Sequence, residues 1–545
     1  MFLRALGKSK FIPATIVLLF FSTYILGGYL IYKDYGVSTD EPVDYLMGQI
    51  NFERFSGGTL VQFQKDCSMI DSTYICYYPS FFSMLLYRFA PYGDKQPVIL
   101  HDPWWYGPSG NTQSIYLHRH QLTFAFFAFS VFIFFLIGKK IFKNWEIGLL
   151  GALFLIISPR IFANSFYNPK DIPFLSLYII AIYTLLLFLE NKNIFTAILH
   201  GLATGVLCST RTPGMIIIPI TFFFYFFDLF LTKAKWKSHL RACAFLITTL
   251  IIAAALVYWF TPVLYSDPIA NFIKIFNIMK QFPWNDYQLY MGHNIMGMVP
   301  WHYSLVWFAI SSPVFYLLLF LLGAALSIAR TVKSRTREQF RSMRDIYLVG
   351  ACGILPIIAV ILMKSTLYNG DRQMYFVYPA LLLVSLYGFK CLIDKIRQKN
   401  LRWQLWTAII LVAGLAYPVY FIVRYHPYEY VYFNFLAGPR MSDIKENYEL
   451  DGWGLSVKDG LEYILKNDSS SRIYVSLFDG QPQGYYMLPL SDRGRLKVNS
   501  DAGLPTYIVT TFRYYPQQIV TKGKIYYSIK VGDAAILTIY KIPRK

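Results

Sequence analysis

The sequence predicts a polytopic α-helical membrane protein with a small mixed α/β domain at its C-terminal end. Three observations support this fold class. The 545 residues are 55% hydrophobic and only 15% charged, which is more apolar surface than a soluble core can bury. The apolar residues form runs of about twenty, the length of a membrane span. After about residue 424 these runs give way to short alternating segments that are typical of strands.

Windows of about twenty apolar residues predict about eleven transmembrane helices. Their approximate limits are 11–32, 120–138, 146–163, 172–189, 194–210, 213–231, 242–260, 304–328, 346–363, 374–392 and 405–423. The first run follows Arg4, Lys8 and Lys10, as in a signal peptide. It is long enough to span the membrane and no small-residue cleavage site follows it, so we expect an uncleaved helix.

The basic residues predict the orientation of the chain. The net charge is +20, but the charges are not gathered into one patch, so no nucleic-acid partner is expected. They cluster in alternate loops, at 139–143, 192, 233–241, 330–344 and 395–402. Because cytoplasmic loops are enriched in Lys and Arg, we expect a cytoplasmic N-terminus in the inner (plasma) membrane. An odd number of spans then makes the C-terminal domain periplasmic or extracellular.

We expect two domains, a transmembrane domain at 1–423 and an extracytoplasmic α/β domain at 424–545. In the second, strands are expected at 472–478, 506–511, 524–530 and 535–541, with a helix near 457–466. The long first outer loop, 33–118, contains an apolar run at 77–89 that suits an interfacial helix. Trp104, Trp105 and Tyr106 would lie at the same depth, although such aromatics also fit an ordinary interfacial belt. Cys67 and Cys76 share this loop and could form a disulfide in an oxidising compartment.

Acidic residues at the outer membrane boundary are the first candidates for chemistry. Asp40 and Glu41 follow the first span, and Asp171 stands before the fourth between Pro169 and Pro173. Such a carboxylate can accept the proton of an attacking hydroxyl group. The alternative in both places is a helix N-cap, because each segment also resembles a helix start.

Cationic side chains lie at the same boundary. Arg211 and Arg372 are candidate phosphate ligands, because a guanidinium pairs bidentately with phosphate, and Lys364 is a third, weaker candidate. Alternatively, Arg211 snorkels to a lipid head group and Asp371 neutralises Arg372.

Histidines and aromatics at the outer end of the next span complete the candidate set. His293 lies in the loop 261–303, and Trp301, His302 and Tyr303 end it, so we expect these four to line the site. A histidine here can bind a metal or a phosphate. No metal-ligand spacing is recognisable, so a divalent metal stays open and no cofactor is certain.

Several short motifs follow one another along the membrane part of the chain. They are Thr39-Asp40-Glu41-Pro42, Tyr167-Asn168-Pro169-Lys170-Asp171-Ile172-Pro173, Arg211-Thr212-Pro213, Pro300-Trp301-His302-Tyr303, Asp371-Arg372 with Tyr378-Pro379, and His426-Pro427-Tyr428-Glu429-Tyr430-Val431-Tyr432-Phe433-Asn434. This ordered set resembles the polyprenyl-phosphate-dependent glycosyltransferases of the C superfamily (GT-C). The most similar are the family-39-like enzymes, which include protein O-mannosyltransferases and the aminoarabinose transferase of lipid A. The resemblance covers residues 1 to about 435, and Asp451-Gly452-Trp453-Gly454 resembles bacterial relatives of uncharacterised specificity.

The resemblance implies the GT-C fold and an inverting transfer of a hexose or pentose from a polyprenyl-phosphate donor. The acceptor would be a lipid, glycan or protein on the non-cytoplasmic face. It implies Asp40 as the base or acceptor-orienting carboxylate, Glu41 as its neighbour, Asp171 as a second acid, and Arg211 and Arg372 as phosphate contacts. Some relatives use a divalent metal and others do not. No nucleotide sugar is available outside the cytoplasm, so the activated donor must cross attached to lipid, and its leaving phosphate needs fixed cations.

Two other classes of protein have to be weighed against a transferase. A transporter or flippase of lipid-linked saccharides would place polar residues near the bilayer midplane and show internal repeats. Here the spans are almost free of charge and the candidates lie at one boundary. A scaffold that only anchors the tail would need a single span.

Overall fold

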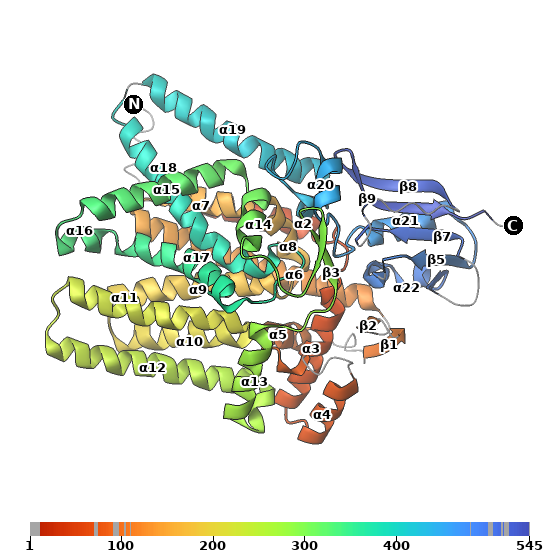
Figure 1. Cartoon of the computed structure of the whole chain (residues 1–545), viewed down its shortest axis with the longest axis horizontal. Helices are drawn as coiled ribbons and strands as arrows, with labels where there is room; N and C mark the ends of the chain where they lie inside the picture. Colours follow the sequence, from red (N-terminus) through yellow and green to blue (C-terminus); the bar gives the residue numbers. More distant parts are fainter. Residues whose placement is uncertain are drawn as a thin grey trace.

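The computed structural model describes residues 11–69, 75–90, 98–102, 105–108, 111–399, 401–479, 481–499, 505–513, 516 and 523–543. A bundle of long helices forms one end of the molecule, and a small sheet with short helices covers the other end (Figure 1). Within the described residues, nine helices are long and apolar enough to cross a membrane. The chain is therefore a multi-pass membrane protein, as predicted.

The nine spans begin and end close to the predicted limits. They are α2 (Phe11–Ile31), α6 (Thr112–Phe142), α9 (Asp171–Glu190), α11 (Ile217–Leu231, after η2 Thr212–Ile216), α12 (Trp236–Phe260), α15 (Val314–Lys333), α17 (Arg344–Met363), α18 (Tyr378–Ile396, after η4 Arg372–Val377) and α19 (Leu401–Tyr425). The helix α10 (Ile194–Thr210) is apolar but shorter than these spans. It occupies the segment predicted at 194–210. The fifth predicted segment is therefore a helix, but it is shorter than the nine full-length spans.

Two predicted spans are each broken by a proline. The segment predicted at 146–163 forms α7 (Trp145–Ile156) and α8 (Pro159–Tyr167), which meet at a bend of 70°. The segment predicted at 304–328 forms α14 (Tyr303–Ser311) and α15. Ser158 and Ser312 are extended at these breaks, with ψ of 106° and 147°. A proline ring disfavours the helical region for the residue before it, which favours a break at Ser158 and at Ser312. Pro356 in α17 and Pro418 in α19 do not break their helices.

Short elements cover the ends of the spans that lie nearest the sheet (Figure 1). The first outer loop forms α3 (Asp40–Phe55), α4 (Leu60–Met69), η1 (Ile75–Tyr77), α5 (Phe81–Arg88), β1 (Val98–Asp102) and β2 (Trp105–Pro108). The segment between α12 and α14 forms η3 (Pro262–Tyr265), α13 (Pro268–Lys280), β3 (Tyr287–Tyr290) and β4 (His293–Met296). The helix expected at 77–89 is thus present as α5, and Cys67 and Cys76 form a disulfide with their Cα atoms 5.9 Å apart. Trp104 lies outside the described residues.

The C-terminal region contains a mixed five-stranded sheet. Its elements are η5 (Glu429–Val431), α20 (Met441–Asn447), α21 (Val457–Asn467), β5 (Ile473–Leu477), η6 (Pro482–Met487), α22 (Leu490–Arg493), β6 (Leu496–Val498), β7 (Tyr507–Thr510), β8 (Lys524–Val531) and β9 (Ala534–Lys541). The strand order is β6-β5-β7-β9-β8, with β5 parallel to β6 and β7, and β9 antiparallel to β7 and β8. All four predicted strands and the predicted helix are confirmed, and β6 was not predicted.

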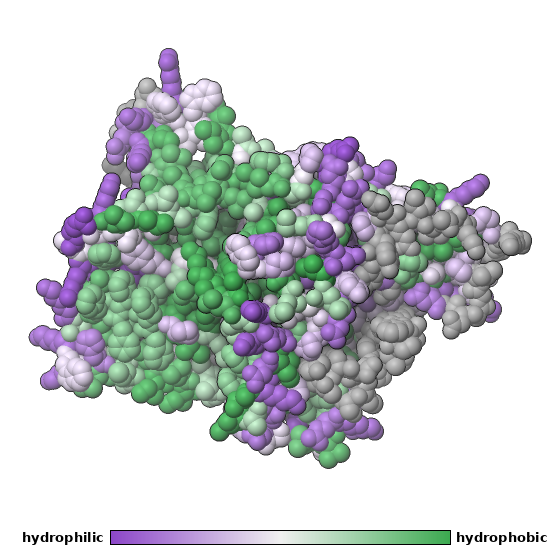
Figure 2. All heavy atoms as spheres, in the orientation of Figure 1, coloured by the Kyte–Doolittle hydropathy of each residue, from purple (hydrophilic) through white to green (hydrophobic). Residues whose placement is uncertain are grey.

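Charge is distributed unevenly along the bundle. A hydrophobic band covers the middle of the visible face, and hydrophilic residues lie at its two ends (Figure 2). The α11–α12 turn and α16 (Arg337–Ser342) lie at the end opposite the sheet (Figure 1). There the buried Asp228 pairs with Lys192 at 2.5 Å and with Arg344 at 2.6 Å. Side chains from two of the basic loops used to predict the orientation, at 192 and at 330–344, therefore meet around a buried carboxylate at this end.

Candidate active site

The start of α3 separates the roles of the two acidic neighbours. Glu41 is 1% exposed, and its carboxylate accepts a hydrogen bond from the backbone N–H of Ser38 at 2.7 Å and lies 3.0 Å from His120 Nε2. Asp40 is the first residue of α3, and its side chain is 25% exposed. The Glu41 carboxylate is thus occupied by the segment before the helix and by His120, whereas the Asp40 carboxylate contacts Arg372. Thr39 is the N-cap residue and forms no side-chain capping hydrogen bond.

The start of α9 shows the same division. Asn168 Oδ1 accepts hydrogen bonds from the backbone N–H groups of Lys170 and Asp171, at 3.2 and 2.9 Å. Asn168 therefore satisfies the helix start, and the Asp171 carboxylate is available for other contacts. It is 1% exposed and forms ion pairs with Arg211 and with Arg372.

Four side chains from four separate segments form a continuous series of ion pairs, which we call the ion-pair chain: Asp40, Arg372, Asp171 and Arg211. Arg372 Nη1 lies 2.9 Å from Asp40 Oδ2 and 3.2 Å from Asp171 Oδ2, and Arg211 Nη1 contacts Asp171 Oδ1. Asp371 does not neutralise Arg372, because its carboxylate contacts Arg160 at 3.3 Å and Ser311 at 2.5 Å. Arg372 Nε and Nη2 have no hydrogen-bond partner within the described residues.

The surrounding charges keep Asp40 ionised. Burial alone would raise the pKa of this carboxyl group, but the positive charges of Arg372 and Lys170 outweigh that effect and hold its pKa below the ordinary value. The Asp40 carboxylate is also more exposed than those of Glu41 and Asp171. It therefore remains a proton acceptor at neutral pH that an approaching hydroxyl group can reach.

An apolar groove lies beside the ion-pair chain. Its volume is about 310 Å³, within the range of ligand-binding cavities. Most of its wall is apolar, and the apolar lining includes Met215, Ile216, Phe276, Val360 and Phe376. Arg211 and Tyr368 also line the groove, and the Arg372 guanidinium lies 5.0 Å from the centre of the Tyr368 ring. The groove thus brings an apolar surface into contact with the cationic members of the ion-pair chain.

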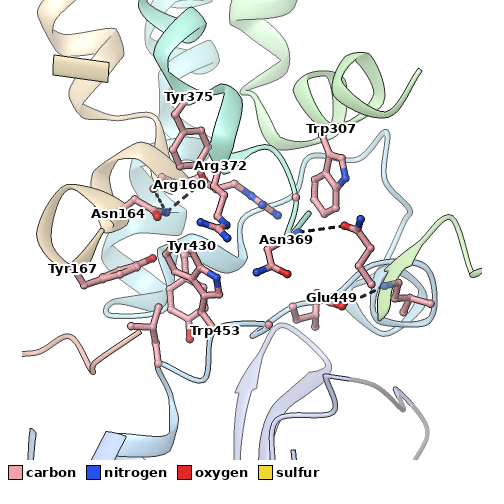
Figure 3. A pocket seen from close by; sticks show the side chains of 16 residues that line it. Arg160, Asn164, Tyr167, Trp307, Asn369, Arg372, Tyr375, Tyr430, Glu449 and Trp453 are labelled. Atoms are coloured by element: carbon pink, nitrogen blue, oxygen red, sulfur yellow. Dashed lines mark hydrogen bonds between the residues drawn. The ribbon is translucent and has the colours of Figure 1, made fainter. Parts of the chain in front are cut away.

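Arg372 also borders a second, polar cavity (Figure 3). Its volume is about 70 Å³. Arg372, Asn369, Trp307, Trp453 and Glu449 are among the residues that line it. Burial raises the pKa of Glu449 to about 7, so this carboxyl group changes charge near neutral pH.

The C-terminal region closes the polar cavity. The backbone carbonyl of Trp453 accepts hydrogen bonds from the N–H of Thr39 at 3.3 Å and from Thr39 Oγ1 at 3.1 Å. The Trp453 indole lies 4.6 Å from the Arg372 guanidinium, a cation–π distance. A side chain on Gly36 would meet the carbonyl oxygen of Leu455 at 2.3 Å, so the first outer loop and the C-terminal region approach each other directly.

The remaining predicted residues lie at varying positions around these cavities. Tyr303 is buried, and its hydroxyl donates to Gln288 Oε1 at 2.6 Å and accepts from the Gly370 N–H at 3.1 Å. It therefore supports two residues of the polar cavity wall. His302 Nδ1 lies 2.8 Å from the Tyr290 hydroxyl. The other three are exposed, and none is part of the ion-pair chain: His293, Trp301 and Lys364.

The acidic and histidine side chains of the site do not form a ligand set for a divalent metal. No group of three or more His, Cys, Asp and Glu side chains is gathered anywhere in the described part of the chain. Asp40 and Asp171 are bridged by the Arg372 guanidinium. The donor set at this point fits an arginine better than it fits a cation that requires several oxygen ligands.

Sequence reasoning did not assign several residues of the site. Trp453 belongs to a motif to which the sequence gives no role, and no pattern in the sequence singles out Asn369 or Arg160. Arg160 Nε donates to the Tyr432 carbonyl at 2.8 Å, and its guanidinium lies 5.2 Å from the Trp307 ring. The Asp-Gly-Trp-Gly pattern was the signal available for Trp453, because glycines on both sides of an aromatic residue indicate a tight loop.

Comparisons with known proteins bear on the membrane part of the chain. No curated protein matches the sequence. Among solved structures, ArnT from Cupriavidus metallidurans in the apo state is 13% identical, with 96% of this chain and 98% of that chain covered and a TM-score of 0.48. The same protein bound to undecaprenyl phosphate is 14% identical over the same shares, with a TM-score of 0.47. The Archaeoglobus fulgidus oligosaccharyltransferase tethered with an acceptor peptide is 12% identical, with 85% and 60% covered and a TM-score of 0.45.

At these TM-scores none of the three structures defines the fold or function of this chain. The sequence comparison is more specific. Residues 120–259, which run from α6 to α12, match the family model of dolichyl-phosphate-mannose-protein mannosyltransferases. Two of the ordered motifs, Tyr167–Pro173 and Arg211–Pro213, lie within the matched residues, so over this segment the chain is similar to that family.

Proposed function

We propose that this protein is an inverting glycosyltransferase that moves a hexose or pentose from a polyprenyl-phosphate donor to a lipid, glycan or protein acceptor. This proposal rests on the contact between the apolar groove and the ion-pair chain. Arg211 itself lines the groove, and Arg372 contacts Tyr368 of the groove wall. A polyprenyl phosphate is an apolar chain that ends in a dianionic or monoanionic head. The groove offers a surface for the chain, and the arginines offer charge for the head.

The arginines would stabilise the leaving group. As the bond between the sugar carbon and the phosphate oxygen breaks, negative charge grows on the phosphate. Arg372 Nε and Nη2 have no partner within the described residues and are available to meet that charge. Asp171 holds Arg211 and Arg372 in place beforehand, so the donors need no rearrangement during the reaction. Asp171 is in this account a positioning residue.

Asp40 would accept the proton of the acceptor hydroxyl. The hydroxyl oxygen attacks the sugar carbon from the face opposite the phosphate and forms the new glycosidic bond with inversion. Its proton passes to the Asp40 carboxylate, which its cationic neighbours keep ionised. Glu41 is occupied by Ser38 and His120, so we assign it the task of holding the start of α3.

We place the site on the non-cytoplasmic face of the inner membrane, with the N-terminus in the cytoplasm. The basic loops around Asp228 support this orientation. Cysteines introduced at two exposed positions test it. Ile525→Cys in β8 should react with an impermeant maleimide from outside, and Arg341→Cys should react only after the membrane is opened. Labelling from the opposite sides would reverse the assignment.

The transfer itself can be measured with purified protein in lipid nanodiscs. Undecaprenyl phosphate carrying a labelled sugar is the donor, and mass spectrometry of cell-envelope glycans with and without the protein identifies the acceptor. We expect transfer that is lost in Asp40→Asn, with unchanged expression and membrane insertion. Undiminished transfer by this variant would remove Asp40 from its role, and a protein that moves the lipid-linked sugar across vesicles without transferring it would favour the flippase alternative.

A further inference from the structure

The polar cavity contains more hydrogen-bonding groups than the surrounding protein satisfies. Arg372 Nε and Nη2, Trp453 Nε1 and Asn369 Oδ1 are buried and have no hydrogen-bond partner within the described residues. All three residues line this one cavity (Figure 3). An unpaired buried polar group costs about 1–3 kcal/mol, so three neighbouring residues with such groups indicate a polar ligand.

Asn369 is held in place by its neighbours. It adopts a left-handed conformation, with φ of 56°, which asparagine tolerates better than most residues. Its backbone N–H donates to Gln288 Oε1 at 3.2 Å, and Gln288 Nε2 donates to the Leu367 carbonyl at 2.9 Å. Gly370 is bonded in turn to the buried Tyr303. The turn that directs the Asn369 amide into the cavity is therefore supported on both sides (Figure 3).

Trp453 is held by a loop with its own polar support. The Asp451 carboxylate, 1% exposed, accepts hydrogen bonds from the backbone N–H groups of Leu455 at 3.1 Å and Ser456 at 3.0 Å. Gly454 has φ of 68°, where a side chain would be strained and would also meet Gln481 Oε1 at 2.4 Å. The Asp-Gly-Trp-Gly pattern thus builds a loop that carries the Trp453 ring, which is 7% exposed, to Arg372.

The cavity is of a size and position that suit part of a sugar. Its volume of about 70 Å³ exceeds the ~10–15 Å³ that one water molecule requires, so several hydroxyl groups fit. Arg372 borders the cavity and also reaches Tyr368 of the apolar groove. A phosphate bound at Arg372 would therefore hold its lipid on one side and its sugar on the other.

We propose that the polar cavity binds part of the sugar of the lipid-phosphate donor, and that Asn369 and Trp453 are specificity-determining residues that hydrogen-bond its hydroxyl groups. The C-terminal region then takes part in donor recognition through Trp453. This inference rests on the proposed function. It adds a ligand class for the polar cavity and a task for a region of the chain that the sequence left unassigned.

Two conservative variants separate recognition of the sugar from recognition of the phosphate. Trp453→Phe keeps an aromatic ring beside Arg372 and removes the indole N–H together with the five-membered ring. Asn369→Gly removes the amide and suits the left-handed backbone. Trp406→Phe is the matched control, because Trp406 is 59% exposed on α19 and lies in neither cavity.

The measurement is the dissociation constant for undecaprenyl phosphate alone and for undecaprenyl phosphate carrying mannose, glucose or aminoarabinose. Wild type and Trp406→Phe should bind one sugar-bearing lipid more tightly than the bare lipid. Trp453→Phe and Asn369→Gly should each reduce this preference by about tenfold, the effect of one lost hydrogen bond, while their affinity for the bare lipid stays unchanged. Thermal unfolding of each variant checks that it is folded.

The outcomes distinguish this inference from the proposed function. Wild-type protein that does not bind undecaprenyl phosphate would refute the proposed function. Wild-type protein that binds the bare lipid and all three sugar-bearing lipids with equal affinity would refute the sugar site but not the proposed function. Variants that retain the wild-type preference, or that lose affinity equally for bare and sugar-bearing lipid, would also refute it.

Discussion

Replacing Arg372 with alanine is the most direct test of the ion-pair chain. Arg372 Nη1 lies 2.9 Å from Asp40 Oδ2 and 3.2 Å from Asp171 Oδ2. If the guanidinium meets the charge on the leaving phosphate, its removal should resemble the loss of one preorganised donor. Such a loss lowers the rate by about 10²–10³, or about 3–4 kcal/mol of transition-state stabilisation.

Arg372→Ala should lose less free energy of unfolding than transition-state stabilisation. Asp171 is 1% exposed but keeps its ion pair with Arg211, so it is not left as an isolated buried charge. Asp40 loses its ion pair, but its side chain is 25% exposed and can be hydrated. We therefore expect a loss of about 1–3 kcal/mol in unfolding free energy, the usual cost of a polar group left unsatisfied.

The assay is kcat/KM for sugar transfer by purified protein, with thermal unfolding measured on the same samples. Arg372→Lys keeps the charge but not the forked geometry, so its activity should fall between that of wild type and that of Arg372→Ala. Arg440→Ala is the control, because Arg440 pairs with Asp443 on the exposed surface of the outer face. If Arg372→Ala transfers sugar as fast as Arg440→Ala does, Arg372 does not stabilise the leaving group.

Three further predictions concern the neighbouring groups. Asp40→Asn should lower transfer by at least about 10²-fold without shifting the unfolding temperature, and a matching fall in both quantities would indicate a structural role instead. Because the Asp40 pKa is lowered, the wild-type rate should not fall between pH 7 and about pH 5 through protonation of this group, and the pH–rate profile checks it. Burial alone would lower the pKa of His426, but Glu429 and Asp34 raise it from 6.5 to about 9. Its stabilising charge is therefore fully present below pH 6.5 and lost as pH rises through about 9. Thermal unfolding of wild type should weaken over that interval, and His426→Gln should show no such change.

Much of the fold follows from segment lengths in the sequence. A run of about twenty apolar residues can do little other than cross a membrane, and all the predicted runs are helical. The breaks at Ser158 and Ser312 were missed because hydropathy averages over a window, whereas one proline acts on one residue. Proline restricts the residue before it, but Pro356 and Pro418 lie inside continuous helices, so the prolines alone do not distinguish the two breaks.

The sequence predicts which residues belong to the candidate site, but it does not predict which of them form ion pairs with one another. The orientation of the loops brings acidic and basic residues to one face, which predicts that Asp40, Asp171, Arg211 and Arg372 share a surface. That Asp171 bridges two arginines depends on how α9, η2 and η4 pack, and no local pattern encodes that packing. The residue that caps a helix is likewise not predictable from the sequence here. Only the structure shows that Asn168 accepts the hydrogen bonds at the start of α9, which leaves the Asp171 carboxylate available for the arginines.

The bond between Thr39 and the Trp453 carbonyl has a consequence for the order in which the protein matures. These residues are 414 positions apart, so the first outer loop reaches the membrane surface long before its partner has been synthesised. Domains form in order from the N-terminus during translation, and contacts at such separation close late. The polar cavity therefore has no complete wall until the segment around residue 453 has been synthesised and has packed against the first outer loop, so the membrane helices alone cannot form it.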